Sequence, residues 1–296
     1  MVCTCKKFTK FIINEINKDN FIKEKFYKKT KNRKYSCKQL CSSLFYLFKS
    51  GSSFRQFNDN SQYIKIFNKN LKYNLPNWNT IYKFYIKLIK YDVICKTFIE
   101  TTKKIIKSKY YVVDTTLISN KGGIDNVDYN IQLPKHKTSK ISIISNKNKI
   151  LDIQLFSGNL NDAGILDKQL NIFNNFEPNL NNILLGDSGY DSNNIRNKLK
   201  NIKFGKLLTY KNKRNTKDKN KLNNLKLSNK EIIILKNKRI KIEHINAKLK
   251  NYKKIIIRYD KKTINYLNTV YFFFNFIKFR LKLILLILFI LFNFTL

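Results

Sequence analysis

The hydrophobic period of the chain changes at Ser108, and this change most limits what the chain can fold into. After it come five short runs rich in β-branched and aromatic residues, which predict strands: KYYVVDTTLIS, KISIIS, KILDIQLFS, NNILLGDS and KLLTY. Two helix-like segments, NDAGILDKQLNIF and DSNNIRNKLKNI, separate the third run from the fourth and the fourth from the fifth. Three strands followed by alternating helices and strands predict an α/β domain, with a mixed sheet flanked by helices.

Before Ser108 the apolar spacing is helical. Residues 36–107 carry two stripes, formed by Leu40, Leu44, Leu47 and Phe48 and by Ile81, Phe84, Tyr85, Leu88 and Ile89. Pro76 precedes the second stripe, with Asn79 or Thr80 as the expected helix cap. The pattern predicts a small all-α domain. It is compatible with a helix-turn-helix unit, and an ordinary helical bundle without DNA contacts fits it equally well.

The remaining segments complete the expected domain plan. Residues 1–35 read as a basic polar lead with weak order, and residues 108–282 contain the sheet domain. Within that domain, 211–230 is nearly devoid of apolar residues and predicts a solvated loop or insertion. The apolar tail 283–296 is shorter than the roughly 20 residues that span a bilayer. Its length favours a buried or interfacial helix over a membrane anchor, so a membrane is not the expected partner.

The charge balance indicates a polyanionic partner. The chain has 59 Lys and Arg residues against 19 Asp and Glu residues, a net charge of +40. This excess favours nucleic acid as the partner, although a coding bias toward Lys, Asn and Ile accounts for part of it. The five cysteines show no paired spacing typical of zinc ligands, and there are only two histidines. Reduced thiols in an intracellular protein are therefore expected.

Two of the scarce acids lie on the predicted strands. Asp114 lies within the first run and Asp187 ends the fourth. If these strands are neighbours in the sheet, the two carboxylates come together, and like charges that close need a cation between them. Carboxylate oxygens select Mg²⁺ or Mn²⁺. The alternative is that each aspartate caps a turn, since DSGYDS is rich in turn residues.

A third acid lies on a predicted helix near the C-terminus. Arg239, Glu243 and Lys250 are spaced by four and then seven residues. At about 100° per residue, the three side chains fall within roughly 60° of one another, so a carboxylate shares its face with two cations. An ordinary salt bridge on a solvated helix face has the same spacing.

The order of these acids resembles that of the DDE transposases of bacterial insertion sequences. The R-x3-E-x6-K part of the family's Y-x2-R-x3-E-x6-K signature matches Arg239, Glu243 and Lys250, and Lys236 stands where the family has tyrosine. VDTT and GDSGYDS resemble the first and second acidic motifs, and SGNLNDAGIL resembles the stretch before the second. LFYLFKSGSSFRQF and NWNTIYKFYIKLIKYDVI resemble the N-terminal DNA-binding region. The resemblance covers about residues 36–281.

This resemblance implies a fold, a site and partners. The fold would be RNase H-like, with Asp114, Asp187 and Glu243 as catalytic residues that hold two Mg²⁺ or Mn²⁺ ions. DNA phosphates would be held by Arg239 and Lys250, and by Lys140 at the expected start of the second strand. The partners would be double-stranded DNA, as terminal inverted repeats and target, and a second or further copies of the chain on that DNA, in an intracellular, DNA-associated setting.

Three other functions remain open from the sequence. A catalytically decayed or domesticated DNA-binding protein is favoured by Lys236 and by the apolar tail, whereas the three retained acids argue against it. A membrane-associated basic protein anchored by residues 283–296 is the second. The third is a nuclease of the same fold that cuts DNA without joining strands.

Overall fold

The computed structural model describes residues 2–28, 34–57, 75–103, 108–146, 149–175, 179–211 and 227–275. The chain forms two compact units, one of Met1–Thr101, Tyr252–Lys254 and Ile264–Leu296 and the other of Thr102–Asn251 and Ile255–Thr263. The predicted tail 283–296 and most of the predicted loop 211–230 lie outside the described residues. In the described ranges, no helix is both long enough and apolar enough to cross a bilayer.

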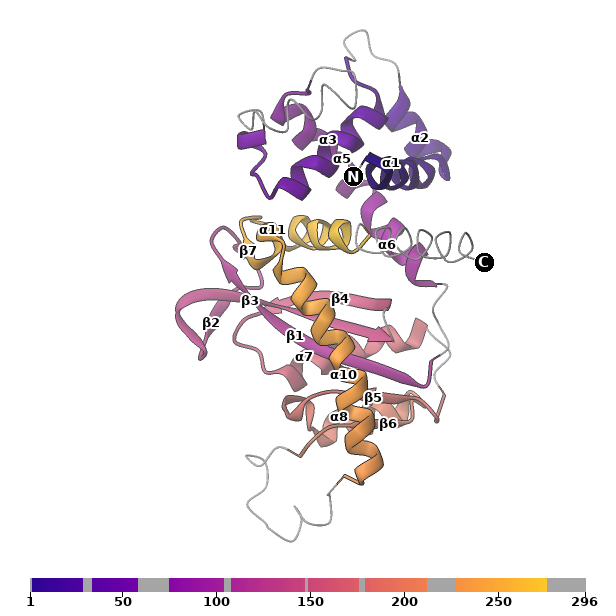
Figure 1. Ribbon diagram of the computed structural model, residues 1–296, viewed down its shortest axis with the longest axis vertical. Coiled ribbons are helices and arrows are strands. Elements are labelled where there is room, and N and C mark those ends of the chain that lie inside the picture. Colours follow the sequence, from indigo (N-terminus) through magenta and orange to yellow (C-terminus); the bar gives the residue numbers. More distant parts are fainter. Residues whose placement is uncertain are drawn as a thin grey trace, which may run out of the picture. The chain divides into compact units, whose positions relative to one another are not determined.

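The first unit is built of helices (Figure 1). Its helices are α1 (Val2–Asn17), α2 (Asn20–Tyr27), α3 (Cys37–Ser50), a 3₁₀ turn η1 (Arg55–Phe57), α5 (Trp78–Lys90), α6 (Val93–Lys103) and a helical segment at 263–275. Both predicted apolar stripes are buried. The ring of Phe48 packs against Tyr85, Phe272 and Phe273, so aromatic contacts join α3, α5 and the helix at 263–275. The prediction of helices ahead of the sheet domain is confirmed.

Residues 1–35 differ from the expected weakly ordered lead, because α1 and α2 lie there. Ile12 and Ile16 are one helical turn apart and buried, as are Ile22 and Phe26. The Asp19 side chain caps α2 by accepting a hydrogen bond from the Ile22 amide at 3.1 Å. The lysines of these helices, at positions 6, 7 and 10 and at positions 23 and 25, made the narrow apolar stripe in each helix hard to recognise from the sequence.

The cap of α5 also differs from the prediction. Asn77, rather than Asn79 or Thr80, is the N-cap, and its side chain accepts a hydrogen bond from the Asn79 amide at 2.9 Å. Asn77 directly follows Pro76 and has extended backbone geometry, which suits a residue that stands just outside a helix.

The second unit contains a mixed sheet of seven strands. They are β1 (Tyr110–Asn120), β2 (Asp128–Asn130), β3 (Leu133–Asn146), β4 (Lys149–Ser157), β5 (Ile183–Leu185), β6 (Lys206–Leu208) and β7 (Ile257–Arg258). β3 pairs antiparallel with β1, β2 and β4, whereas β5 pairs parallel with β1 and β6 parallel with β5. A central strand that is antiparallel to one neighbour and parallel to the other gives the RNase H-like order that the resemblance implied, so the predicted fold class is confirmed.

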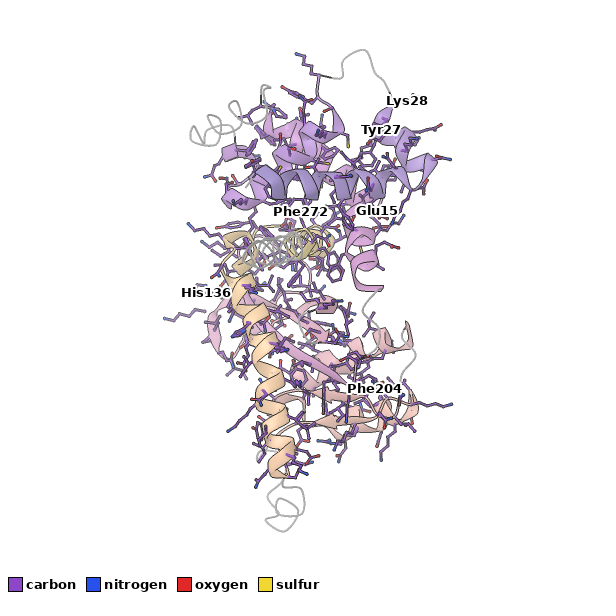
Figure 2. The ribbon with its side chains drawn as sticks, turned by 45° about the vertical axis from the view of Figure 1, so that its right-hand side comes forward. Glu15, Tyr27, Lys28, His136, Phe204 and Phe272 are labelled. Carbon is purple, nitrogen blue, oxygen red and sulfur yellow. The ribbon has the colours of Figure 1, made fainter. Side chains whose placement is uncertain are left out.

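The two faces of β1 pack against different helices. Tyr111 and Val113 belong to a buried cluster with residues of α7 (Asp162–Gln169), the 3₁₀ segment η2 (Leu170–Asn175) and α8 (Asn193–Asn201). Phe204, labelled in Figure 2, belongs to this cluster. The alternate residues of β1 face the other way, toward α10 (Asn229–Lys250), which crosses the sheet in Figure 1. Asp114 is on the α10 face.

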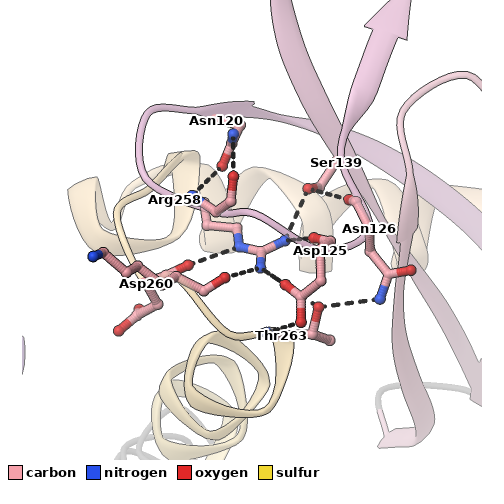
Figure 3. Close-up of polar contacts among 9 residues, drawn as sticks. Asn120, Asp125, Asn126, Ser139, Arg258, Asp260 and Thr263 are labelled. Carbon is pink, nitrogen blue, oxygen red and sulfur yellow. Dashed lines mark hydrogen bonds and ion pairs between the residues drawn. The ribbon is translucent and has the colours of Figure 1, made fainter.

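Arg258 on β7 ties three segments of the second unit together (Figure 3). Its fully buried guanidinium donates to the backbone oxygens of Asp125, Asp260 and Lys261 and pairs with the Asp125 carboxylate. The same carboxylate accepts a hydrogen bond from the Thr263 amide at 2.9 Å, and Ser139 of β3 is a further partner. This network fixes the segment that follows α10 against the loop after β1.

Replacing Arg258 with Met should lower the free energy of unfolding by about 3–5 kcal/mol, because the buried acceptors of the network lose their charged donor. Urea denaturation measures the change. Lys262→Met removes an exposed cation four positions away and should stay within about 0.5 kcal/mol of the parent. Equal stabilities of the two variants would show that the network contributes nothing.

Candidate active site at β1, β5 and α10

The register of β1 and β5 places two aspartates at the same level of the sheet. Val112 lies opposite Leu185 in the parallel pair, and Asp114 and Asp187 each come two positions later. Residues two positions apart on a strand share a face, so this register brings the two strand aspartates singled out in the sequence together. Asp187 also caps the short 3₁₀ turn η3 (Ser188–Tyr190), where its carboxylate accepts a hydrogen bond from the Gly189 amide at 2.8 Å.

Asp114 is a buried carboxyl group with a perturbed pKa. Burial raises its pKa to about 6; the positive charge of Arg239 opposes this increase, and the negative charge of Asp187 adds to it. The Nδ2 group of Asn246 on α10 donates a hydrogen bond to Asp114 Oδ2 at 2.7 Å and also favours the ionised form. The raised pKa shows that the surrounding groups compensate the charge of this carboxylate only in part.

Helix α10 presents Arg239, one of the predicted signature residues, and Asn246 toward Asp114. Arg239 and Asn246 are seven residues apart, so they lie on nearly one line of the helix, and both act on Asp114. Glu243 lies between them in sequence, with its side chain 55% exposed, and its Oε1 is 3.7 Å from Arg239 Nη2. Lys250 is exposed at the end of α10, and Lys236 is exposed one turn before Arg239. The interpretation of the spacing as a Glu and an Arg on one helix face is therefore correct.

The three carboxylates do not converge on a ready-formed metal site. In the part of the chain that the structure describes, no three acidic, cysteine or histidine side chains form a group that could hold a metal ion. The residues nevertheless suit a divalent cation: Asp114 and Asp187 offer the oxygen ligands that Mg²⁺ and Mn²⁺ prefer, and the raised pKa of Asp114 indicates an unbalanced negative charge. Glu243 is held by one long ion pair, so its exposed carboxylate is free to turn.

Asp162 is a residue near this site that the sequence did not single out. It follows the helix cap Asn161, and its Oδ1 accepts hydrogen bonds from Thr115 at 2.9 Å and from Lys140 at 3.0 Å. A Cβ atom added to Gly189 would lie 3.0 Å from Asp187 Oδ1 and 3.1 Å from Asp162 Oδ2, so the glycine lets both carboxylates approach. An acid at the start of a helix normally interacts favourably with the helix dipole. The sequence therefore carries no signal that separates Asp162 from an ordinary helix-start acid.

Lys140 lies in a different place from the one expected. It is in the middle of β3 rather than at a strand start, because the exposed polar residues from Leu133 onward also join the strand by pairing with β2. Its side chain is only 12% exposed, and its Nζ contacts Asp162 at 3.0 Å and the Leu160 carbonyl at 2.8 Å. The charge of Lys140 is therefore already balanced within the chain.

A known protein family matches the part of the chain that contains the sheet. The model of the family described as "Transposase DDE domain" matches residues 106–268. No curated protein sequence matches the chain. Among solved structures, the chain is similar to the Mos1 transposase paired-end complex with left transposon end, at 10% identity and a TM-score of 0.25, over 61% of this chain and 60% of that one. A pre-cleavage Mos1 transpososome is similar at 8% identity and a TM-score of 0.27, over 85% and 79%. The chain thus spans less than two thirds of the first of these proteins, and TM-scores this low support no closer comparison.

The raised pKa of Asp114 predicts how stability depends on pH. A carboxyl group with a folded-state pKa of about 6 binds its proton more tightly in the folded than in the unfolded chain, so its ionisation destabilises the fold as pH rises from about 4 to above 6. Asp114→Asn should therefore raise the free energy of unfolding by about 2–3 kcal/mol at pH 8, and the gain should vanish below about pH 4.

Urea denaturation in EDTA at both pH values measures this difference. Asp125→Asn is a control of opposite sign: burial raises the pKa of Asp125, but the bonds from Thr263 and Arg258 outweigh burial and lower it. That variant should lose stability at pH 8 relative to the parent, and the loss should shrink toward low pH. A pH-independent gain for Asp114→Asn would mean that the charge of Asp114 is not the cause.

Proposed function

Because the chain belongs to the family of transposases with a DDE domain, we propose that it catalyses metal-dependent DNA strand cleavage and strand transfer for an insertion-sequence-like mobile element. The observation that carries the proposal is the meeting of Asp114 and Asp187 across β1 and β5, with Arg239 of α10 acting on Asp114. Within the described ranges, neither aspartate pairs with a cationic side chain at short range, although the chain has 59 Lys and Arg residues.

The proposed metal ligands are Asp114, Asp187 and Glu243. Two bound Mg²⁺ or Mn²⁺ ions would supply the Lewis acidity for attack of water, or later of a DNA 3′-hydroxyl, on a phosphodiester. The two aspartates give the site its fixed part, because β1 and β5 hold their backbones in register. Glu243, whose side chain is exposed on α10, would be the mobile ligand of the site. In this scheme no side chain of the protein acts as a covalent nucleophile.

DNA is the proposed substrate, as terminal inverted repeats and as target, with two or more copies of the chain acting together. Arg239 and Lys250 would hold phosphates beside the acids, the first as a forked donor and the second as a point charge. Lys140 is proposed for a smaller share of this work, because Asp162 already engages it. The net charge of +40 suits a polyanionic substrate.

Replacing Asp114, Asp187 or Glu243 with Ala should abolish cleavage of a DNA that carries the element's ends, while DNA binding persists, because Lys and Arg contacts to phosphate supply most of the affinity. Gel analysis of Mg²⁺-dependent nicking and strand-transfer products beside a binding assay makes the test. Glu15→Ala changes an acid outside the proposed site and is the control. Binding without any cleavage by the parent chain would instead identify a decayed DNA-binding protein, the function that Lys236 favours.

Neutralising Arg239 or Lys250 should weaken DNA binding at low salt and reduce the slope of log affinity against log salt by roughly one unit for each phosphate that the variant no longer holds. The melting temperature of the Lys250 variant should stay within a few degrees of the parent, since an exposed charge is worth at most about 1 kcal/mol. Arg239 is only 20% exposed and opposes the charge of Asp114, so Arg239→Ala should also lower the melting temperature. Binding isotherms at several salt concentrations and a thermal melt make the measurements. If Arg239 serves only its ion pair with Glu243, the salt slope of Arg239→Ala will equal that of the parent.

A further inference from the structure

Asn246 makes a buried polar contact that the transposase signature does not contain. It lies three residues after Glu243 on α10 and is 7% exposed. Its Nδ2 group donates to Asp114 Oδ2 at 2.7 Å, across 132 residues of sequence. Among the described residues, this is the side-chain hydrogen bond that links α10 directly to a proposed catalytic carboxylate.

The orientation of the Asn246 amide is forced by Asp114. Turning the amide by half a turn would set its oxygen against a carboxylate oxygen at hydrogen-bond distance, which is repulsive. The N–H must therefore face Asp114. As a result, Asn246 Oδ1 remains buried without a hydrogen-bond partner. A buried acceptor left unpaired costs about 1–3 kcal/mol.

Stability alone does not account for an asparagine at this position. Leu235, Ile242 and Leu249 are the other fully buried residues of α10, and they are all apolar. A leucine at 246 would extend this apolar face and remove the unpaired acceptor, and this gain would offset the loss of the hydrogen bond to Asp114. The polar side chain at 246 thus fits a role in the site better than a role in the packing.

We propose that Asn246 is a positioning residue that fixes the carboxylate of Asp114 relative to Glu243. Both Asn246 and Glu243 belong to α10, so the hydrogen bond sets where the helix carrying the third acid lies against the strand carrying the first. Groups that orient metal ligands in this way typically change metal affinity or activity 10–100-fold when they are removed. This inference rests on the proposed metal-binding function of Asp114, Asp187 and Glu243.

The experiment measures Mn²⁺ binding to the full chain without DNA, by titration calorimetry, for the parent and for Asn246→Leu. We expect the variant to bind Mn²⁺ about 10-fold more weakly, to melt within a few degrees of the parent and to bind DNA with unchanged affinity. In cleavage assays its kcat should fall while KM for DNA stays constant. Asn246→Ala, which adds no bulk, gives the same comparison if the leucine variant does not fold.

Asn268→Leu is the matched control. Asn268 is fully buried; among the described residues its Oδ1 likewise has no partner, and its Nδ2 donates to the Ile264 backbone oxygen at 2.9 Å. It belongs to the first unit, so its replacement should leave Mn²⁺ affinity unchanged. If both Asn246 variants bind Mn²⁺ as tightly as the parent, the positioning role of Asn246 is wrong, whereas the proposed metal-binding function is unaffected. A parent chain that does not bind Mn²⁺ would overturn the metal-binding function beneath it.

Discussion

The parallel pairing of β1 with β5 is the interaction on which the site depends. It sets Val112 opposite Leu185 and thereby brings Asp114 and Asp187 to one level of a sheet whose other strands are largely buried. Burial of the strands brings these acids together, and it is burial first, with the negative charge of Asp187 adding to it, that raises the pKa of Asp114. The sheet is stable in spite of these two acids, which is common where function places a strained group in a core.

Helix α10 has one face that packs against the sheet and another that is exposed to solvent. Leu235, Ile242 and Leu249 bury the helix against the sheet, and Arg239 and Asn246 extend the same face to Asp114. Residues seven apart fall on nearly one line, so Lys236, Glu243 and Lys250 form a second, exposed line. The same helix therefore packs against the core of the domain and carries the exposed charges that would contact DNA.

The sequence predicts those parts of the fold whose signal is local. The apolar runs predicted β1, β4, β5, β6 and the second half of β3, and helical spacing predicted α10 with its Arg and Glu on one face. The sequence did not predict β2 and β7, because these strands are too short to show a hydrophobic period. It also did not predict α1 and α2, because their lysines interrupt the apolar pattern. Asn246 and Arg258 were missed because their partners lie 132 and 133 residues away, so their roles exist only in the folded chain.

The start of α10 is fixed independently of the chain that leads into it. Ser228 and Glu231 form a reciprocal cap, and Lys206 at the start of β6 holds Glu231 at 2.6 Å. The helix therefore takes its register from its own first turn and from the sheet edge. A change in the number of residues before Ser228 would leave this cap and the Lys206 contact in place, and with them the position of Glu243 along α10.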